Sequence, residues 1–377
     1  MLYLTQRMRP LFCSLVLLAN IATGCDTDPP ERPAAESRPF LMGFTCWPAD
    51  LTQEGVDAAN RFAVAHGDIV SVMFIGGIPW PEALAGKPFS EDVRSAMALA
   101  LPPGKRLLLS ISPLNMERSG LALYWGKADN QPLPQEWREL PLDSPQVRQA
   151  YLAFVLQAVA EMKPDYLAIG VESNVLLSKS AQKWTQFKTL YRETYSAVKR
   201  KHPDLPVFFS TDVLHYLKLA SDARDTDQQA EVMDLMRHSD LFAMSLYPHM
   251  SHEVPRPLPS DLLDFAPRFG KPVVVAESGM TSRDVELKSF GLTLHGSEAD
   301  QKQYLELLLQ TAQRDDYAFV INFATTDFER LCDRLSPPLD DIGRIFCYTG
   351  MQTSDLRPKP ALAVWERYRT MSYRPRP

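Results

Sequence analysis

The fold of this chain is decided by two stretches of sequence, Tyr166-Leu-Ala-Ile-Gly-Val-Glu172-Ser-Asn174 and Lys271-Pro-Val-Val-Val-Ala-Glu277-Ser-Gly279. Each is a short apolar run, typical of a parallel strand that is buried on both faces, and each ends in a glutamate. If both strands belong to one barrel, Glu172 and Glu277 lie at the same face, where barrel enzymes place their active sites. A pair of carboxylates in that position is the arrangement that hydrolyses glycosidic bonds.

Strand-like and helix-like segments alternate along the rest of the chain. Apolar runs typical of strands begin near Phe40, Asp68, Arg106, Asp165, Val207, Leu241, Pro272 and Ala318. Amphipathic segments predict helices at residues 52–65, 90–101, 144–162, 181–201, 228–237, 260–269, 297–313 and 360–368. Eight such units predict an α/β protein with a (β/α)8 TIM barrel. The rival is a doubly wound open sheet, which needs a phosphate-binding glycine cluster, but Gly76-Gly77 is followed by Pro79 where the helix should begin.

The N-terminal residues resemble a lipoprotein signal. Residues 1–24 combine Arg7 and Arg9 with an apolar stretch at 11–21 that is too short to span a bilayer. The ending Ala22-Thr-Gly-Cys25 resembles the lipobox of bacterial lipoproteins, so Cys25 is expected to carry lipid; an ordinary secretory signal is the alternative. Residues 25–39 are rich in proline and predict an extended tether, followed by the barrel at 40–377. The expected location is the bacterial cell envelope, in either membrane.

The composition limits the classes of partner and ligand. The net charge is −6, the pI is near 5.7 and there is no basic stripe, so no nucleic acid is expected to bind. Cys13 leaves with the signal and Cys25 carries lipid, which leaves three cysteines. Cys332 and Cys347 are expected to form a disulfide, with Cys46 free. The cysteines and histidines lack the spacing of a metal site, so neither a metal nor a cofactor is expected.

Aromatic and polar residues stand at the other expected strand ends. Aromatic rings stack on the apolar faces of sugar rings, and amide, carboxyl and imidazole groups bind sugar hydroxyls, so a carbohydrate substrate is expected. The candidate substrate-binding residues are Trp47, Trp80, Asn115, Asn174, Asp212, His215, Tyr247, His249 and Asn322. A packing or lid role is an equally good interpretation of Trp47 and Trp80, and a structural role is the commoner one for His215 and His249.

Four motifs carry a resemblance to a known group of enzymes. They are Gly170-Val-Glu172-Ser-Asn174, Ser245-Leu-Tyr247-Pro248, Val275-Ala-Glu277-Ser-Gly279 and Arg357-Pro-Lys-Pro-Ala-Leu-Ala-Val-Trp365. These motifs are similar to those of clan A glycoside hydrolases, in particular the endo-β-1,4-galactanase group. The resemblance implies a retaining mechanism in which Glu172 is the acid/base and Glu277 is the nucleophile. It also implies that Tyr247 hydrogen-bonds the nucleophile.

Two features of the sequence depart from the clan's pattern. Val171 stands where the clan has an asparagine that contacts the sugar's 2-hydroxyl, and the first two strand ends lack the arginine that the clan places near the nucleophile. A monomeric glycosidase acting on a β-linked oligo- or polysaccharide is the favoured function. The alternatives are a non-catalytic sugar-binding or envelope lipoprotein on the same barrel, and a barrel enzyme of different chemistry. No lysine stands at a strand end, which disfavours aldolase-like chemistry.

Overall fold

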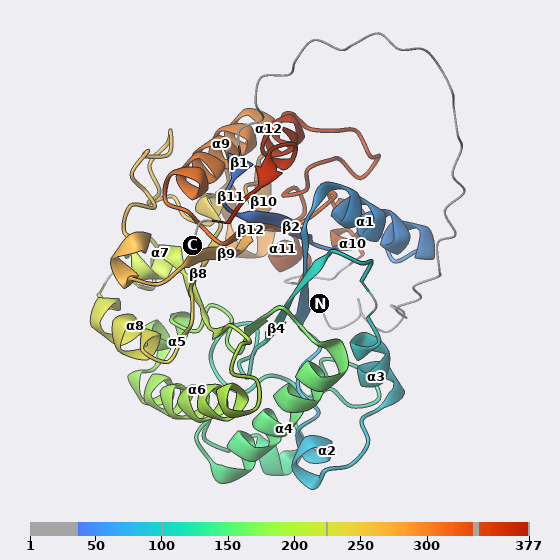
Figure 1. Cartoon of the computed structure of the whole chain (residues 1–377), viewed down its shortest axis with the longest axis vertical. Helices are drawn as coiled ribbons and strands as arrows, with labels where there is room; N and C mark the ends of the chain where they lie inside the picture. The colour runs from blue at the N-terminus through green and yellow to red at the C-terminus, as the bar shows by residue number, and fades with distance from the viewer. Residues whose placement is uncertain (1–36, 100, 224, 335–338, 376–377) are drawn as a thin grey trace.

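The computed structural model describes residues 37–375 apart from 100, 224 and 335–338 (Figure 1). The predicted signal, Cys25 and most of the predicted tether lie outside the described residues. Nine parallel strand segments form the central sheet, in the order β6-β5-β4-β3-β2-β12-β9-β8-β7. Their bounds are β2 Leu41–Thr45, β3 Ile69–Phe74, β4 Arg106–Ile111, β5 Tyr166–Ala168, β6 Val207–Phe208, β7 Ser210–Asp212, β8 Phe242–Leu246, β9 Val273–Ser278 and β12 Phe319–Asn322.

The two ends of this sheet are parts of one strand. β6 pairs with β5 and β7 pairs with β8, and the two segments are separated by Phe209 alone. The amide of Ser210 donates to the carbonyl of Gly170 at 2.9 Å, so pairing beside β5 continues across the interruption. The sheet therefore closes into a barrel of eight parallel strands, which confirms the predicted (β/α)8 fold. All eight strands begin within one residue of their predicted positions.

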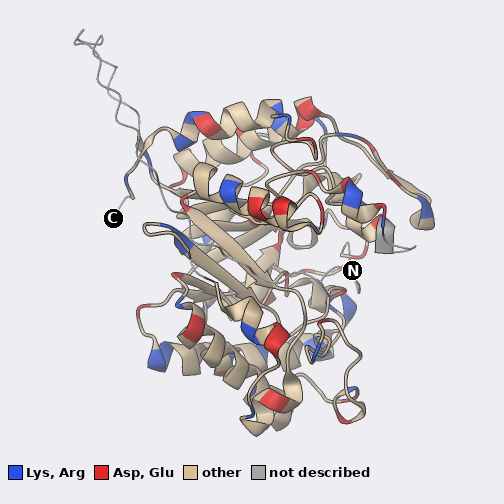
Figure 2. Ribbon diagram, turned by 90° about the vertical axis from the view of Figure 1, so that its right-hand side faces the viewer, with Lys and Arg blue, Asp and Glu red and all other residues tan. Residues whose placement is uncertain are grey.

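Helices surround the barrel on its outer side (Figure 1). Their bounds are α1 Gln53–His66, α2 Trp80–Ala85, α3 Glu91–Met97, α4 Pro145–Met162, α5 Val175–Lys179, α6 Ala181–Lys201, α7 Val213–Tyr216, α8 Gln229–Met236, α9 Glu298–Arg314, α10 Glu329–Cys332, α11 Leu339–Arg344 and α12 Pro360–Arg369. Short side chains start several of them by accepting an amide hydrogen of the first turn, as at Thr52, Ser90, Ser144, Ser180 and Ser297. Figure 2 shows the charged residues gathered on these helices and on loops, while the strands carry few.

One predicted helix is wrong. Residues 260–269 form turns that end in a short 3-10 helix, η3 (Ala266–Phe269). The reason is Pro267, which lacks an amide hydrogen and whose ring would clash with the carbonyl of Leu263 in a continuous α-helix. The sequence also did not predict α2 or the small elements η1 (Gln135–Trp137), η2 (Pro248–Met250) and η4 (Lys288–Phe290).

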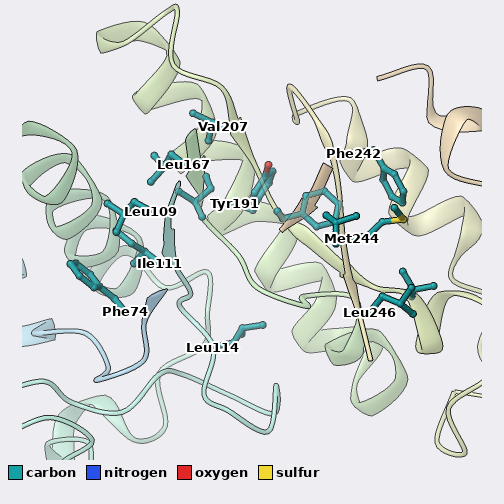
Figure 3. Close-up of a cluster of buried hydrophobic side chains, with 14 of the residues drawn as sticks. Phe74, Leu109, Ile111, Leu114, Leu167, Tyr191, Val207, Phe242, Met244 and Leu246 are labelled. Atoms are coloured by element: carbon teal, nitrogen blue, oxygen red, sulfur yellow. The ribbon is translucent and has the colours of Figure 1, made fainter. Parts of the chain in front are cut away.

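The apolar core has two layers because the strands are apolar on both faces. Inside the barrel, one cluster fills the interior with Leu41, Ile69, Leu108, Ala168, Phe208, Leu241, Ala243, Val274, Ala276, Phe319 and Ile321. Alternate residues of the same strands face the helices, as Leu109 and Met244 do in Figure 3. This alternation explains why the strands read as continuous apolar runs in the sequence. Burial on both faces fixes the register, and hence the positions of the residues at the strand ends.

Smaller elements complete the described chain. β1 (Ser37–Arg38) lies at the end of the predicted tether and pairs in parallel with β13 (Ser372–Tyr373). β10 (Val285–Leu287) and β11 (Leu292–Leu294) form an antiparallel hairpin after β9. The described residues contain no helix with the length and apolar character needed to span a membrane.

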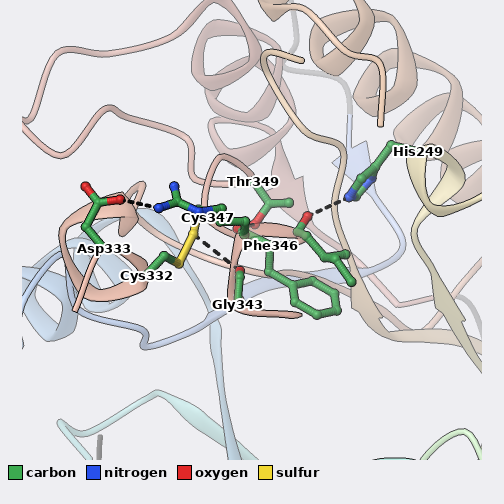
Figure 4. The surroundings of a disulfide bond; sticks show 9 residues. His249, Cys332, Asp333, Gly343, Phe346, Cys347 and Thr349 are labelled. Atoms are coloured by element: carbon green, nitrogen blue, oxygen red, sulfur yellow. Dashed lines mark hydrogen bonds and ion pairs between the residues drawn. A yellow bond between two sulfur atoms is a disulfide. The ribbon is translucent and has the colours of Figure 1, made fainter. Parts of the chain in front are cut away.

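A disulfide joins Cys332 to Cys347, as the sequence predicted (Figure 4). Cys46 is free. The disulfide closes the segment that follows β12. This segment packs against the carboxyl ends of the strands, because the carbonyl of Ile345 accepts a hydrogen bond from His249 Nε2 at 2.9 Å. Burial raises the pKa of the Cys46 thiol to about 12, so this cysteine is held as an unreactive thiol.

Candidate active site

Glu172 follows β5 and is held by hydrogen bonds to three different segments. Ser245 Oγ donates to Glu172 Oε1 at 2.6 Å, and Arg118 Nη2 donates to Glu172 Oε2 at 2.6 Å. The amide of Glu172 donates to Ser210 Oγ at 2.9 Å. The backbone of Glu172 is left-handed, with φ of 49°, which a residue other than glycine adopts when its surroundings hold it there. The carboxylate is thus fixed in direction, and 18% of the side-chain surface stays exposed.

Glu277 lies within β9 and is contacted by a phenol from the neighbouring strand. Tyr247 follows β8, and its hydroxyl donates a short hydrogen bond to Glu277 Oε1. The ladder between β8 and β9 shifts register between Met244 and Ser245, so that Ser245 is paired with Glu277. Such a bulge redirects side chains. It places the serine that holds Glu172 directly beside Glu277, so the structure brings the two predicted glutamates into one site.

Burial of Glu277 and the negative charge of Glu172 raise the pKa of Glu277 to about 7. The hydrogen bond from Tyr247 and the positive charge of Arg118 act in the opposite direction without cancelling this effect. The charge state of Glu277 therefore depends on the negative charge of Glu172 beside it. Burial and the charge of Glu277 raise the pKa of Tyr247 well above its ordinary value, so the phenol stays protonated and remains a hydrogen-bond donor.

Arg118 is the residue of this site that sequence reasoning missed. It lies in the loop after β4, beyond the strand end itself, and its Nε donates to the carbonyl of Val171 at 3.0 Å. The available signal was the polar turn Asn115-Met-Glu-Arg118-Ser-Gly120, which directly follows the third strand end. Asn115, a predicted substrate-binding residue, organises this turn: its Oδ1 accepts from the amide of Ser119 at 2.8 Å.

Asp212 and His215 lie next to the pair of glutamates. Asp212 Oδ1 accepts from the amide of His215 and lies 2.8 Å from His215 Nδ1, and Asp222 Oδ1 lies 2.9 Å from His215 Nε2. Burial alone would lower the pKa of His215, but Asp212, Asp222 and Glu172 outweigh it and raise the pKa. Asp212 in turn contributes to the raised pKa of Glu277. The structure therefore places these two predicted residues close enough to the glutamates for their charges to shift one another's pKa values: Glu172 acts on His215, and Asp212 acts on Glu277.

The structure places four other predicted residues in the packed interior. The ring of Trp80 is fully buried, stacks on Trp137 at 5.5 Å and donates to the carbonyl of Ala122 at 2.9 Å. A ring without exposed surface cannot stack on a sugar, so Trp80 is a packing residue.

The side chains of Asn174, His249 and Asn322 are likewise engaged within the protein. Asn174 bonds the backbone of Asp212 in both directions, at 2.9 and 2.7 Å. Asn322 Nδ2 donates to the carbonyls of Ala324 and Thr349, at 3.1 and 3.3 Å. Burial lowers the pKa of His249 to about 4, so this imidazole is neutral and serves to bond Ile345. These three residues shape the loops around the site.

Trp47 differs from Trp80 because it is half-buried, at the end of the first barrel strand. Its ring packs against Phe323 at 5.8 Å and Phe328 at 5.7 Å. Tyr247 belongs to the same aromatic cluster, since its ring meets that of Phe323 edge-on at 6.4 Å. Trp47 is therefore linked by ring contacts to the residue that holds Glu277. Among the described residues, no group of three His, Cys, Asp or Glu side chains is arranged to hold a metal ion.

Residues 123–318 match the family described as glycosyl hydrolase family 53, and this segment is more than half of the chain. It contains Glu172, Tyr247 and Glu277. The chain belongs to glycosyl hydrolase family 53. The resemblance to clan A glycoside hydrolases that the sequence motifs indicated is thus confirmed. No curated protein matches this family 53 chain in sequence.

Solved structures of glycosidases share the fold of the family 53 chain. An exo-β-1,4-mannosidase from Opitutaceae bacterium strain TAV5 has a TM-score of 0.59 and 16% identity, over 88% of this chain and 59% of its own. A Bifidobacterium dentium β-glucuronidase has a TM-score of 0.52 and 15% identity, over 88% of this chain and 47% of its own. A Dictyoglomus thermophilum β-D-glucuronidase has a TM-score of 0.52 and 14% identity, over 89% of this chain and 51% of its own. The family 53 chain spans about half of the length of these structures, and at this identity the likeness shows the fold alone.

Proposed function

We propose that this family 53 chain is a retaining glycoside hydrolase that acts on a β-linked oligo- or polysaccharide. One observation carries the proposal: two glutamates from different strands lie in one site, each held by its own donors. Ser245 and Arg118 hold Glu172, and Tyr247 holds Glu277. Two carboxyl groups in distinct surroundings are what an acid/base and a nucleophile need.

The reaction runs in two steps at the anomeric carbon of the sugar. Glu277, ionised, attacks this carbon and forms an ester, while Glu172, protonated, gives its proton to the departing glycosidic oxygen. Water then attacks the same carbon, Glu172 takes a proton from it, and the bond to Glu277 breaks. The configuration at the anomeric carbon is retained because it inverts twice.

The strand pairing supports retention rather than inversion. Retaining enzymes hold their carboxyl groups about 5–5.5 Å apart, and inverting ones about 6.5–9.5 Å. Ser245 bonds Glu172 directly and is the ladder partner of Glu277. Neighbouring strands lie about 4.8 Å apart, so the backbone of Glu277 lies about that distance from the backbone of Ser245, whose side chain contacts Glu172. This short connection favours the smaller separation.

The experiment is a hydrolysis panel with the stereochemistry of the product as its readout. It includes β-1,4-galactan, β-1,4-mannan and aryl β-glycosides, among them a glucuronide. The proposal predicts release of sugar from at least one of these, with the β-anomer seen first by NMR. Release of the α-anomer first would overturn retention, and the absence of any hydrolysis would overturn the enzyme assignment.

A second candidate is a non-catalytic sugar-binding lipoprotein on the same barrel. Val171 favours it, because its buried apolar side chain offers no hydrogen bond at the position next to Glu172. Calorimetry on the same panel separates the candidates: binding of a glycan that is never hydrolysed supports the second one.

We also propose that the protein is monomeric and is anchored in the bacterial envelope by lipid on Cys25. The disulfide between Cys332 and Cys347 supports an oxidising compartment, since such bonds are rare in the cytosol. Cys25→Ser should release an active, folded protein into the soluble fraction, because acyl chains and not the barrel would hold it at the membrane. If the variant still sediments with membranes after a salt wash, the lipid anchor is refuted; light scattering tests the monomer.

A further inference from the structure

Arg118 contacts the candidate acid/base, Glu172, and the residue before it in the chain, Val171. Its Nη2 lies 2.6 Å from Glu172 Oε2, and its Nε lies 3.0 Å from the carbonyl of Val171, the residue before it. A planar guanidinium with fixed donor directions can grip a side chain and a backbone group together, which a lysine cannot do. The arginine therefore fixes both the carboxylate of Glu172 and the left-handed backbone that carries it.

The loop that carries Arg118 is itself held firmly. The amide of Asn115 donates to the carbonyl of Gly120 at 3.0 Å, which closes the turn, and Arg118 is also left-handed, with φ of 51°. Two lysines fasten the loop from outside: Lys183 Nζ donates to the carbonyl of Ser119 at 2.6 Å, and Lys179 Nζ donates to the carbonyl of Glu117. With 11% of its side chain exposed, Arg118 is a preorganised group rather than a mobile surface cation.

The charges around Glu277 give this arginine a second role. Glu277 faces Tyr247 after β8, Glu172 after β5, Asp212 at the end of β7, and Arg118. Glu172 and Asp212 are negative and oppose ionisation of Glu277, while the positive charge of Arg118 lowers its pKa. The imidazole of His215, which is also nearby, is already paired with Asp212 and Asp222.

We propose that Arg118 is a positioning residue: it fixes Glu172 at its left-handed strand end, and its positive charge favours the ionised form of the nearby Glu277. Its effect on catalysis rests on the proposed hydrolase function, but its effect on the pair of glutamates does not. Arg118 acts through Glu172 and Glu277 and needs no contact with the sugar.

Two variants separate charge from geometry. Arg118→Met removes the charge and keeps a side chain of similar volume. The acid limb of the kcat/KM–pH profile should therefore move to higher pH by about one unit, because a nearby positive charge lowers the pKa of a carboxyl group by about this much. Arg118→Lys keeps the charge but loses the grip on Val171, so that limb should stay in place. In both variants kcat at its optimum should fall about 10- to 100-fold, because small misplacements of a reacting group have this effect. Arg138→Met, an exposed arginine of the same connection whose Nε donates to the carbonyl of Leu133, should match wild type.

A titration that needs no substrate tests the inference independently of the function. With ¹³C-labelled glutamate carboxyls assigned through E277Q, the titration midpoint of Glu277 should rise in Arg118→Met and stay unchanged in Arg118→Lys. A midpoint that does not move in either variant, whatever happens to the melting temperature, would overturn the inference. If wild-type protein hydrolyses no glycan while the midpoint moves as expected, the proposed function fails and the role of Arg118 stands.

Discussion

Replacing Tyr247 with phenylalanine removes the hydroxyl that donates to Glu277 Oε1 and leaves the ring in its aromatic cluster. The hydrogen bond stabilises the ionised form of Glu277, so its loss must raise the pKa of Glu277 further. A hydrogen bond to a charged group contributes about 1.5–3 kcal/mol, and one pKa unit corresponds to about 1.4 kcal/mol. The expected rise is therefore about one to two units above the wild-type value of about 7.

The consequence is a change in rate that depends on pH. As nucleophile Glu277 must be ionised, so kcat/KM of the wild type should fall as the pH drops below about 7. In Tyr247→Phe the same fall should begin at about pH 8–9, which makes the variant about 10- to 100-fold slower at pH 6. At pH values above the new limb the difference should shrink.

The assay is kcat/KM for an aryl β-glycoside between pH 5 and 10, with melting curves at both ends of the range. Tyr151→Phe is the matched control, because it also removes a buried phenol hydroxyl, one that bonds the carbonyls of Ile111 and Ile169 away from the site. An acid limb that stays within about 0.3 unit of wild type in Tyr247→Phe would refute the reasoning. A uniform loss at all pH values would mean that the tyrosine serves packing alone.

Two further predictions concern stability, one for the two tryptophans and one for the disulfide. Trp80→Ala should lower the free energy of unfolding by about 3–5 kcal/mol, because the ring is fully buried. Trp47→Ala should lower it by only about 1–2 kcal/mol and should weaken oligosaccharide binding. Equal melting temperatures of the two variants would contradict the assignment of Trp80 to packing. Opening the disulfide with a reductant should lower stability by about 3 kcal/mol, as expected for a closed loop of this length. A Cys332→Ser/Cys347→Ser double variant should no longer respond to the reductant. Alkylation of both Cys332 and Cys347 in the unfolded, unreduced wild type would show that the bond does not form.

The barrel could be predicted from sequence because its strands are buried on both faces. An apolar run such as Val273–Ser278 has few other stable environments, and eight of them separated by amphipathic segments leave a closed barrel as the simplest arrangement. The segment at 260–269 failed because its apolar spacing suits a helix while Pro267 prevents one. Here a local backbone constraint outweighed periodicity.

The glutamates could be predicted because strand ends meet at one face, but the residues around them could not be sorted. Trp47 and Trp80 both stand near strand ends, yet the first is half-buried in a cluster beside Tyr247 and the second turns into the packed layer under α2. Arg118 was missed because its position depends on a turn closed by Asn115 and on lysines from α5 and α6. Such contacts are long-range and have no periodicity in the sequence.

The most direct test of the central claim is the kinetics of two variants on one aryl β-glycoside whose leaving group departs without protonation. Glu277→Gln should show no turnover, because no glycosyl ester can form. Glu172→Ala should retain hydrolysis of this substrate and be accelerated by azide, which enters the space that the carboxylate vacates. If both variants hydrolyse it at the wild-type rate without an effect of azide, Glu172 and Glu277 are not the catalytic pair.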